Sequence, residues 1–475
     1  MTSVHLPEEL LQQIMWGLKL DVYSNASADD KLTTRKTLLS CMLANSTLHR
    51  LAEPVLYHTI SQHELTTLVR CLVRRPKLVS LVRTLRDCQN GAHYQLTAGL
   101  HDIDAWRTGN IDICELWGWP YDIPAIGFIL LLCTRLETLV LEKNACDQTL
   151  PNGDVLEECT ALHQKSQTLS GTPLAALRTL VMQPGPGYHF EMNEYDDRWF
   201  PGLVFLPNIE TIEIAELGMY EFEVPSYAGI STLKSLTVGF LNMDGFGYTG
   251  QVALSMVLES LLPKCPALQY LDVNFQSGPN EGDDWWDALG SMLSNYAPSL
   301  CTLHIHNPYE VVMPPEDGAP INLATMTQLR TLTLPGDAIL PSRYNRHGIS
   351  ASRGEQRVDD SDHGNANSHP NDVPRDDEGQ PACIQGPEEG FDPTSVSLTA
   401  VLPPNLTQLA IVDNTNLPSN VARLDFELRK MMLSPRFRDL ETIRIRRDQA
   451  PTKHIMEVDW EVQEEDGYWK VSRRI

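Results

Sequence analysis

A six-residue pattern recurs along most of the 475-residue chain: an apolar residue, two variable residues, an apolar residue, one variable residue and an apolar residue. A weaker copy, VRTLRD, begins at Val82. Self-similarity at intervals of tens of residues is typical of repeat proteins. Nine copies share the full spacing: LETLVL from Leu136, LRTLVM from Leu177, IETIEI from Ile209, LKSLTV from Leu233, LQYLDV from Leu268, LCTLHI from Leu300, LRTLTL from Leu329, LTQLAI from Leu406 and LETIRI from Leu440.

The spacing within each hexamer predicts a β-strand with one buried face. Side chains alternate along a strand, so Leu139 and Leu141 point into a core, whereas Thr138 and Val140 point away from it. Helical patterns precede several copies, and this alternation predicts parallel strands with the helices outside. No copy can bury its apolar face alone, but stacked copies share a continuous core. The sequence therefore predicts an α/β solenoid over residues 61–450.

The hexamer resembles the core of the leucine-rich repeat, L-x-x-L-x-L-x-x-N. The ninth-position asparagine falls only at Asn144 and Asn414. The starts from 136 to 329 are 24 to 41 residues apart, longer than the usual ~20–29, so the resemblance is to the irregular, helix-bearing intracellular type. It implies strands on the concave side of the solenoid and helices outside. Short strands after helices also occur in other α/β proteins, but nine equally spaced copies argue against that alternative.

Two segments depart from the repeat pattern. Residues 342–395 are rich in polar residues and contain few apolar ones, so we expect a disordered acidic insertion within one repeat. The hexamers at 329 and 406 lie 77 residues apart, and subtracting these 54 residues leaves an ordinary 23. A solvated spacer and a regulatory segment are both compatible with this composition. Residues 451–475 alternate apolar and polar around Asp466-Gly467, which predicts a hairpin covering the last repeat.

The first 60 residues predict a separate helical unit. Pro7 followed by acidic residues indicates a helix start, and the spacing of Leu10, Ile14 and Leu18 gives it one apolar face. We expect a loop over residues 21–34, then one helix from Leu38 to Ala52 that ends before Pro54.

This unit resembles an F-box, which opens L-P-x-E-L and continues with a second helix ending in P-x-L-Y. The loop over 21–34 is longer than usual, and Leu48 occupies an aromatic position of the family. The resemblance implies docking on the Skp adaptor, and through it on the cullin, of a cullin–RING ubiquitin ligase. The adaptor contacts it implies are Leu6, Pro7, Leu10 and Ile14. The residues that carry the resemblance are Leu6, Pro7, Glu9, Leu10, Ile14, Leu43, Asn45, Leu51, Ala52, Pro54, Leu56 and Tyr57.

Two functions remain open at this stage. In the first, the chain is the substrate-recognition subunit of such a ligase. In the second, the helices only cover the exposed end of the first repeat, and the chain is a repeat scaffold without a ligase role.

The outward strand positions are the expected contacts for a target protein, because the concave surface is the usual contact face of a solenoid. Tyrosine and arginine often dominate interfaces. Only the last repeat clusters arginines, as recognition of a phosphorylated target would require. The alternative is that all these positions are simply solvated. The residues we single out are Tyr270, Asp272, His304, His306, Arg444 and Arg446.

Other function classes lack support. The nucleotide-binding, hydrolase and metalloprotease motifs we sought do not occur, so we expect neither enzyme activity nor a cofactor. His304 and His306 lack a third ligand, so we expect no metal. A net charge of −25 argues against binding to nucleic acid or to anionic membranes. No signal-peptide pattern opens the chain and the ten cysteines are scattered, which favours the cytosol or nucleus.

Overall fold

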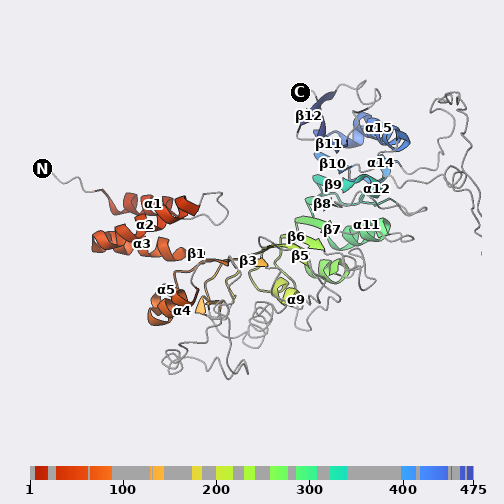
Figure 1. Cartoon of the computed structure of the whole chain (residues 1–475). Helices are drawn as coiled ribbons and strands as arrows, with labels where there is room; N and C mark the ends of the chain where they lie inside the picture. The colour runs from red at the N-terminus through yellow and green to blue at the C-terminus, as the bar shows by residue number, and fades with distance from the viewer. Residues whose placement is uncertain are drawn as a thin grey trace, which may run out of the picture.

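One long β-sheet organises the chain in the computed structural model (Figure 1). The structure describes residues 6–19, 28–61, 65–87, 129–130, 132–143, 174–184, 199–217, 229–240, 257–275, 285–306, 320–339, 397–412, 418–447, 451, 460–465 and 468–473. Within these ranges the sheet has 13 strands: β1 (Thr59–Ser61), β2 (Thr84–Asp87), β3 (Thr138–Lys143), β4 (Thr179–Pro184), β5 (Thr211–Leu217), β6 (Ser235–Phe240), β7 (Tyr270–Phe275), β8 (Thr302–His306), β9 (Thr331–Pro335), β10 (Gln408–Val412), β11 (Thr442–Arg446), β12 (Trp460–Glu465) and β13 (Tyr468–Arg473).

Strands β1 to β11 are parallel and follow one another in sequence order. The third residue of each hexamer pairs with the third residue of the next, as Thr138 pairs with Thr179 and Thr179 with Thr211. The predicted stack of parallel strands is therefore confirmed for all nine hexamers and for the weaker copy at Val82. The pattern missed β1, which is only three residues long.

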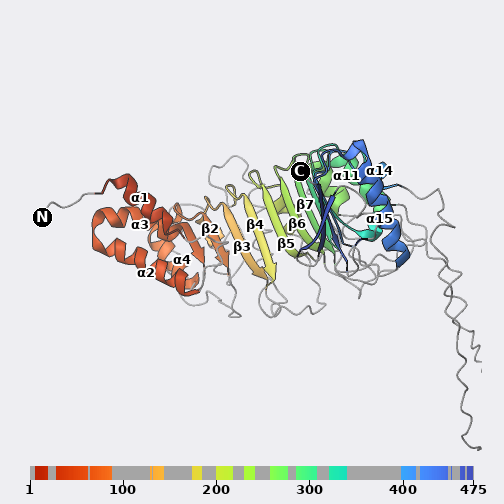
Figure 2. The ribbon, with the colours of Figure 1, turned by 90° about the horizontal axis from the view of Figure 1, so that it is seen from above.

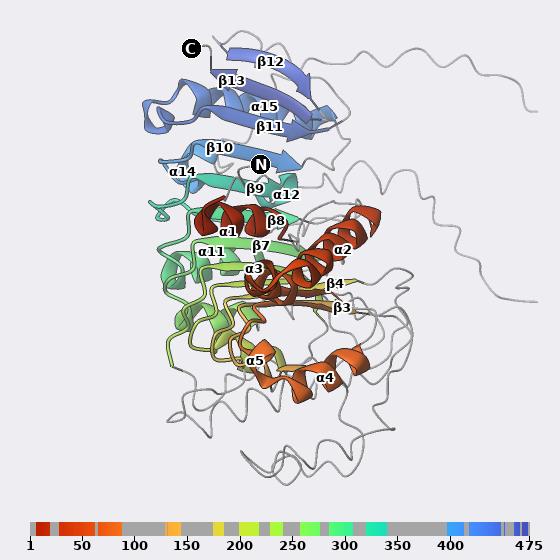
Figure 3. The same cartoon turned by 90° about the vertical axis from the view of Figure 1, so that its left-hand side faces the viewer.

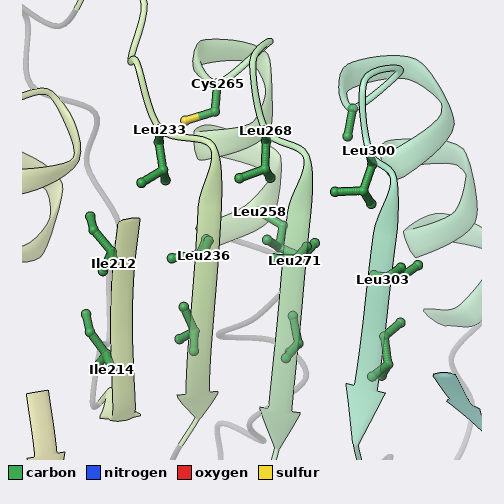
Figure 4. Packing of buried hydrophobic residues seen from close by; sticks show 14 of the residues in the cluster. Ile212, Ile214, Leu233, Leu236, Leu258, Cys265, Leu268, Leu271, Leu300 and Leu303 are labelled. Carbon is green, nitrogen blue, oxygen red and sulfur yellow. The ribbon is translucent and has the colours of Figure 1, made fainter. Parts of the chain in front are cut away.

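The buried face of the sheet forms one continuous core. Leu236, Leu271 and Leu303 stand at the fourth hexamer position of neighbouring strands and are fully buried (Figure 4). Leu268, the first residue of its hexamer, closes the turn above the same core. Each fully buried leucine contributes about 1.5–3 kcal/mol relative to an exposed one. Stacking the repeats is thus the main source of stability.

The helices lie on the outer side of the arc that the strands describe. Figures 1 and 2 place them on the same side of the sheet, leaving the other face to the concave side. The prediction of helices outside parallel strands is confirmed. They are α4 (Leu65–Arg74), α5 (Pro76–Val79), α9 (Trp199–Val204), α11 (Trp285–Tyr296), α12 (Gly336–Ile339), α14 (Leu398–Val401) and α15 (Pro418–Leu433).

Backbone bonds tie each repeat to the one before it. The carbonyl of Glu137 accepts from the N–H groups of Arg178 at 2.8 Å and Thr179 at 3.0 Å. These bonds hold the start of each strand in register, so a one-residue slip would break both. The same paired bonds are accepted by the carbonyls of Arg83, Arg178, Glu210, Lys234, Gln269, Cys301, Arg330 and Thr407.

The flanks of the long insertion attach to one short segment. Ile321 N donates to Ala338 O and Leu323 N donates to Val401 O, both at 2.8 Å. The chain therefore leaves the repeat after α12 and returns before α14 at neighbouring points. Strands β9 and β10 pair in register despite the insertion. The predicted disordered insertion, 342–395, lies outside the described residues.

The N-terminal unit consists of α1 (Glu8–Gly17), α2 (Ala28–Ala44) and α3 (Ser46–His58). The predicted single helix over 38–52 is wrong, because the helix breaks at Asn45, whose side chain accepts from Leu48 N at 2.8 Å and caps α3. The predicted loop over 21–34 is too long, since α2 begins at Ala28.

Pro54 lies inside α3 and does not end it. A proline here costs one helical hydrogen bond. The burial of Leu51, Ala52 and Val55 offsets that cost. These residues form, with Met15 and Leu38, a small core separate from the core of the sheet.

The chain's last described strands extend the sheet. β12 and β13 pair antiparallel, and β13 also pairs antiparallel with β11. Val471 is fully buried and Trp460 nearly so, and both join the main core. The structure thus places an antiparallel pair over the last repeat. Among the described helices none combines the length and apolar character needed to cross a bilayer.

Candidate functional site

The N-terminal unit exposes apolar side chains on two of its helices. Leu6, Leu10 and Ile14 are 49%, 45% and 53% exposed, and we call them with Pro7 the α1 stripe. Leu10 and Ile14 are four residues apart and so share one face of α1. On α2, Leu39 and Leu43 are also exposed. All four residues of the sequence-predicted adaptor site therefore lie at the surface.

Helix α1 has one wide apolar face and buries only one side of it. Met15, which is 4% exposed, packs into the small core, with Leu11 and Leu18 beside it. The salt bridge from Arg50 to Glu8, 2.6 Å, joins α3 to the start of α1. The α1 stripe forms the other, exposed side of this face and is not part of the small core among the described residues. The described residues of the N-terminal unit leave this apolar side uncovered.

The predicted target-binding residues of β7 and β8 form one connected cluster. Tyr270 OH donates to Asp272 Oδ2 at 3.1 Å, and His306 Nε2 lies 3.6 Å from Asp272 Oδ1. His304 Nδ1 lies 2.7 Å from Thr333 Oγ1 on β9. The ring of His304 is 5.6 Å from that of Tyr270 and 6.0 Å from that of His306. These contacts fix the side chains in place.

The cluster is mainly a hydrogen-bonding surface at neutral pH. Burial, followed by the charge of Asp272, raises the pKa of Tyr270 to about 12. Burial lowers the pKa of His304, and the nearby Asp272 carboxylate opposes that effect. Tyr270 is thus a protonated phenol, and His304 is neutral. On β5, burial raises the pKa of Glu213.

Arg444 and Arg446 form a second, separate group on β11. Both are exposed, whereas Ile443 and Ile445 between and beside them are fully buried. Three strand steps separate β8 from β11, or about 14 Å at the usual strand spacing. The six predicted target residues therefore divide into a central polar cluster and a C-terminal basic group.

The sequence analysis placed one buried strand residue on the exposed side of the sheet and missed two residues of the predicted target-binding surface. Val140 was expected to point away from the core but is only 2% exposed, and it lies in register with Val181 of β4, which is 1% exposed. Two residues next to these groups were not predicted: Thr333, which contacts His304, and Lys470 of β13, which stands opposite Arg444. The strand register would have found them, since Thr333 pairs with His304 and Lys470 pairs with Arg444.

Reactive groups are scarce in the described part of the chain. Burial raises the pKa of the thiols of Cys133 and Cys265 to about 12, so neither is a thiolate at neutral pH. Three or more His, Cys, Asp or Glu residues positioned to hold a metal ion do not occur together among the residues described. The features that stand out are surfaces suited to binding other proteins.

Comparison with known proteins adds little. No protein-family model and no curated protein sequence matches the chain. Among solved structures, the crystal structure of a TLR13–ssRNA13 complex is similar at 14% sequence identity, with a TM-score of 0.22. The similarity covers 58% of this chain and 37% of that chain.

Proposed function

We propose that this protein is the substrate-recognition subunit of a cullin–RING ubiquitin ligase. The exposed α1 stripe carries the proposal, because it lies on a helical unit with its own core. The resemblance to an F-box supplies the partner: a Skp-type adaptor that the α1 stripe contacts and that links the protein to the cullin. The concave face of the sheet receives the target protein.

In this function the protein transfers nothing itself. It holds the target near the ubiquitin-charged conjugating enzyme and so raises the target's effective concentration there. A stiff stack of repeats suits this role, because the distance between the two binding surfaces stays fixed. Figure 1 places α1, α2 and α3 beside the β1 end of the sheet, away from β7 to β11, and in the view of Figure 3 the same helices stand in front of the strands.

Co-purification with a Skp-type adaptor tests the proposal. We expect the intact chain to retain the adaptor and Leu10→Asp with Ile14→Asp to lose it, because two charges would then be buried in the contact. The matched control is Gln12→Asp with Gln13→Asp, which adds the same charge to exposed positions of the same helix. Circular dichroism checks that both variants fold. Failure of the intact chain to bind, or retention by the Leu10/Ile14 variant, contradicts the proposal.

A repeat scaffold without a ligase role is the second candidate. It is favoured by the direct passage from α3 into β1, which places the N-terminal helices at the open end of the sheet. Under this alternative the α1 variants leave every interaction of the protein unchanged.

A further inference from the structure

The C-terminal end of the concave face carries three cations close together. Arg444 and Arg446 lie two residues apart on one face of β11, and Lys470 of β13 stands directly opposite Arg444. Directly opposite residues of an antiparallel pair have Cβ atoms about 4.5–5.5 Å apart. We call Arg444, Arg446 and Lys470 the C-terminal basic patch.

The neighbouring strands do little to neutralise this patch. On β10, the residues in register with Arg444 and Arg446 are Ala410 and Val412. Neither arginine makes an ion pair or side-chain hydrogen bond with any other described residue. Lys470 is paired, since its Nζ lies 3.1 Å from Glu465 Oε2 on β12. Among the described residues, the two guanidinium groups thus have no side-chain partner, and they lie on the concave side of the sheet.

Arg444 stands directly opposite Lys470, an arrangement in which like charges repel, and the pairing of Lys470 with Glu465 weakens that repulsion. An anionic ligand would offset the remaining repulsion. The planar guanidinium group matches a carboxylate through two parallel hydrogen bonds. Side chains two residues apart on an extended strand are about 6.6–6.8 Å apart, so two acidic residues at positions i and i+2 of an extended segment match the two arginines.

We propose that the C-terminal basic patch binds an acidic, extended segment of a partner protein, with alternate Asp or Glu side chains on Arg444 and Arg446. This rests on the proposed function in that the concave face receives the target. The central cluster of Tyr270, Asp272 and His304 then contacts neutral, polar residues of the same partner, because Asp272 repels further acidic ones.

The charge of the whole molecule does not oppose this binding. The net charge is −25, but interactions between exposed charges are screened beyond about 8 Å at physiological ionic strength. Asp272 on β7 lies four strand steps from β11, or about 19 Å away. Glu461 and Glu465 on β12 bound the patch on its far side. These two carboxylates would repel an anion that extends past the patch, so the patch suits a short acidic segment better than a long polyanion such as a nucleic acid.

Peptide binding to the full-length chain tests this inference. The probe is a fluorescent 12-residue peptide containing Glu-Ser-Glu-Ser-Glu, and its control carries Gln in place of Glu. We expect the acidic peptide to bind at least ten times more tightly than the Gln peptide, and to bind more weakly as salt is raised. Arg444→Gln with Arg446→Gln should weaken binding at least ten-fold. The control variant, Arg135→Gln with Arg438→Gln, removes the same charge from exposed turns before β3 and β11. It should change the affinity for the acidic peptide less than two-fold.

Three results would overturn the inference: no binding of the acidic peptide at 1 mM, equal loss in both arginine variants, or equally tight binding of a single-stranded oligonucleotide that competes with the peptide. Adaptor co-purification is measured on the same preparations. If the protein binds the peptide but not the adaptor, the proposed ligase role is contradicted and the proposed acidic-segment site stands. If it binds the adaptor but not the peptide, only the acidic-segment site is contradicted.

Discussion

In several repeats, a polar residue just before the hexamer bonds to a backbone carbonyl of the preceding repeat. Asn405 Nδ2 donates to Thr327 O at 2.8 Å, and Ser299 Oγ donates to Leu268 O at 2.8 Å. Asn208 and Thr232 do the same in their repeats. Each bond satisfies a carbonyl at the entry to a strand of the preceding repeat, so these polar residues link neighbouring repeats at the start of their strands.

A single histidine at the junction between the N-terminal unit and the sheet should make stability depend on pH. Burial, then the charges of Lys19 and Arg83, lower the pKa of His58 from 6.5 to about 4. Its ring meets the edge of Trp16 at 5.3 Å between centroids. Between about pH 6.5 and pH 4, His58 is therefore protonated in the unfolded chain but neutral in the folded one. Its contribution to the free energy of unfolding is complete above about pH 6.5 and is lost as the pH drops toward 4.

The prediction is that His58→Gln loses less stability between pH 7.5 and pH 4.5 than the wild type does. Because His58 is only half-buried and screened by solvent, we expect the difference to be about 1 kcal/mol. Urea unfolding at the two pH values measures it, with His49→Gln on the same helix as the control. A pH dependence that is equal in His58→Gln and in the wild type contradicts the assignment.

At the scale of the element, the hexamers predicted strands well because they report burial directly. Their period of two distinguishes the core-facing residues, such as Ile443, from those facing out, such as Arg444. The same reasoning failed where packing overrides local preference. Pro54 stays helical because its neighbours are buried, and Val140 is covered although it points away from the core. The break between α2 and α3 was visible in advance, since asparagine followed by serine is a common helix start.

The two ends of the sheet are protected in different ways. β1 has only three residues, and β12 carries Glu461, Glu464 and Glu465. Short or charged edges discourage pairing with strands of other chains. The final pair also covers the core of β11, because Val471 lies against it in register with Ile443.

We expect Val471→Asp to destabilise the protein by more than about 3 kcal/mol, because it buries an unpaired charge in the core. Nearest-neighbour stability predicts that the loss is greatest in the last repeats. Amide hydrogen exchange measures it as faster exchange in β10 and β11 than in β3 to β5. Ser472→Asp places the same charge one residue away on the other face and should change exchange little. Uniform acceleration along the sheet would show that the array unfolds as one unit.

At the scale of the whole molecule, the sheet is a continuous scaffold that tolerates the 54 residues of 342–395 in one of its connections. The paired attachments at Ile321 and Leu323 explain this tolerance, because they fix both flanks of the insertion to the same segment. The sequence predicted the insertion from its polar composition and from the repeat spacing. It could not predict the attachments, which depend on backbone bonds between residues about 17 and 78 positions apart.

The last prediction follows from these attachments. Replacing residues 342–395 by six Gly or Ser residues should leave the fold intact and raise the free energy of unfolding by about 1 kcal/mol, since the loop between Ala338 and Val401 becomes roughly four-fold shorter and costs less entropy to close. Urea unfolding measures the change. The matched control replaces residues 336–401 by the same linker, which also removes Ala338 and Val401 and so the two anchoring bonds. Only this second variant should lose the pairing of β9 with β10. If the shorter deletion also unfolds the protein, the insertion is part of the fold, because the anchors alone would then be insufficient to carry the sheet from one repeat to the next.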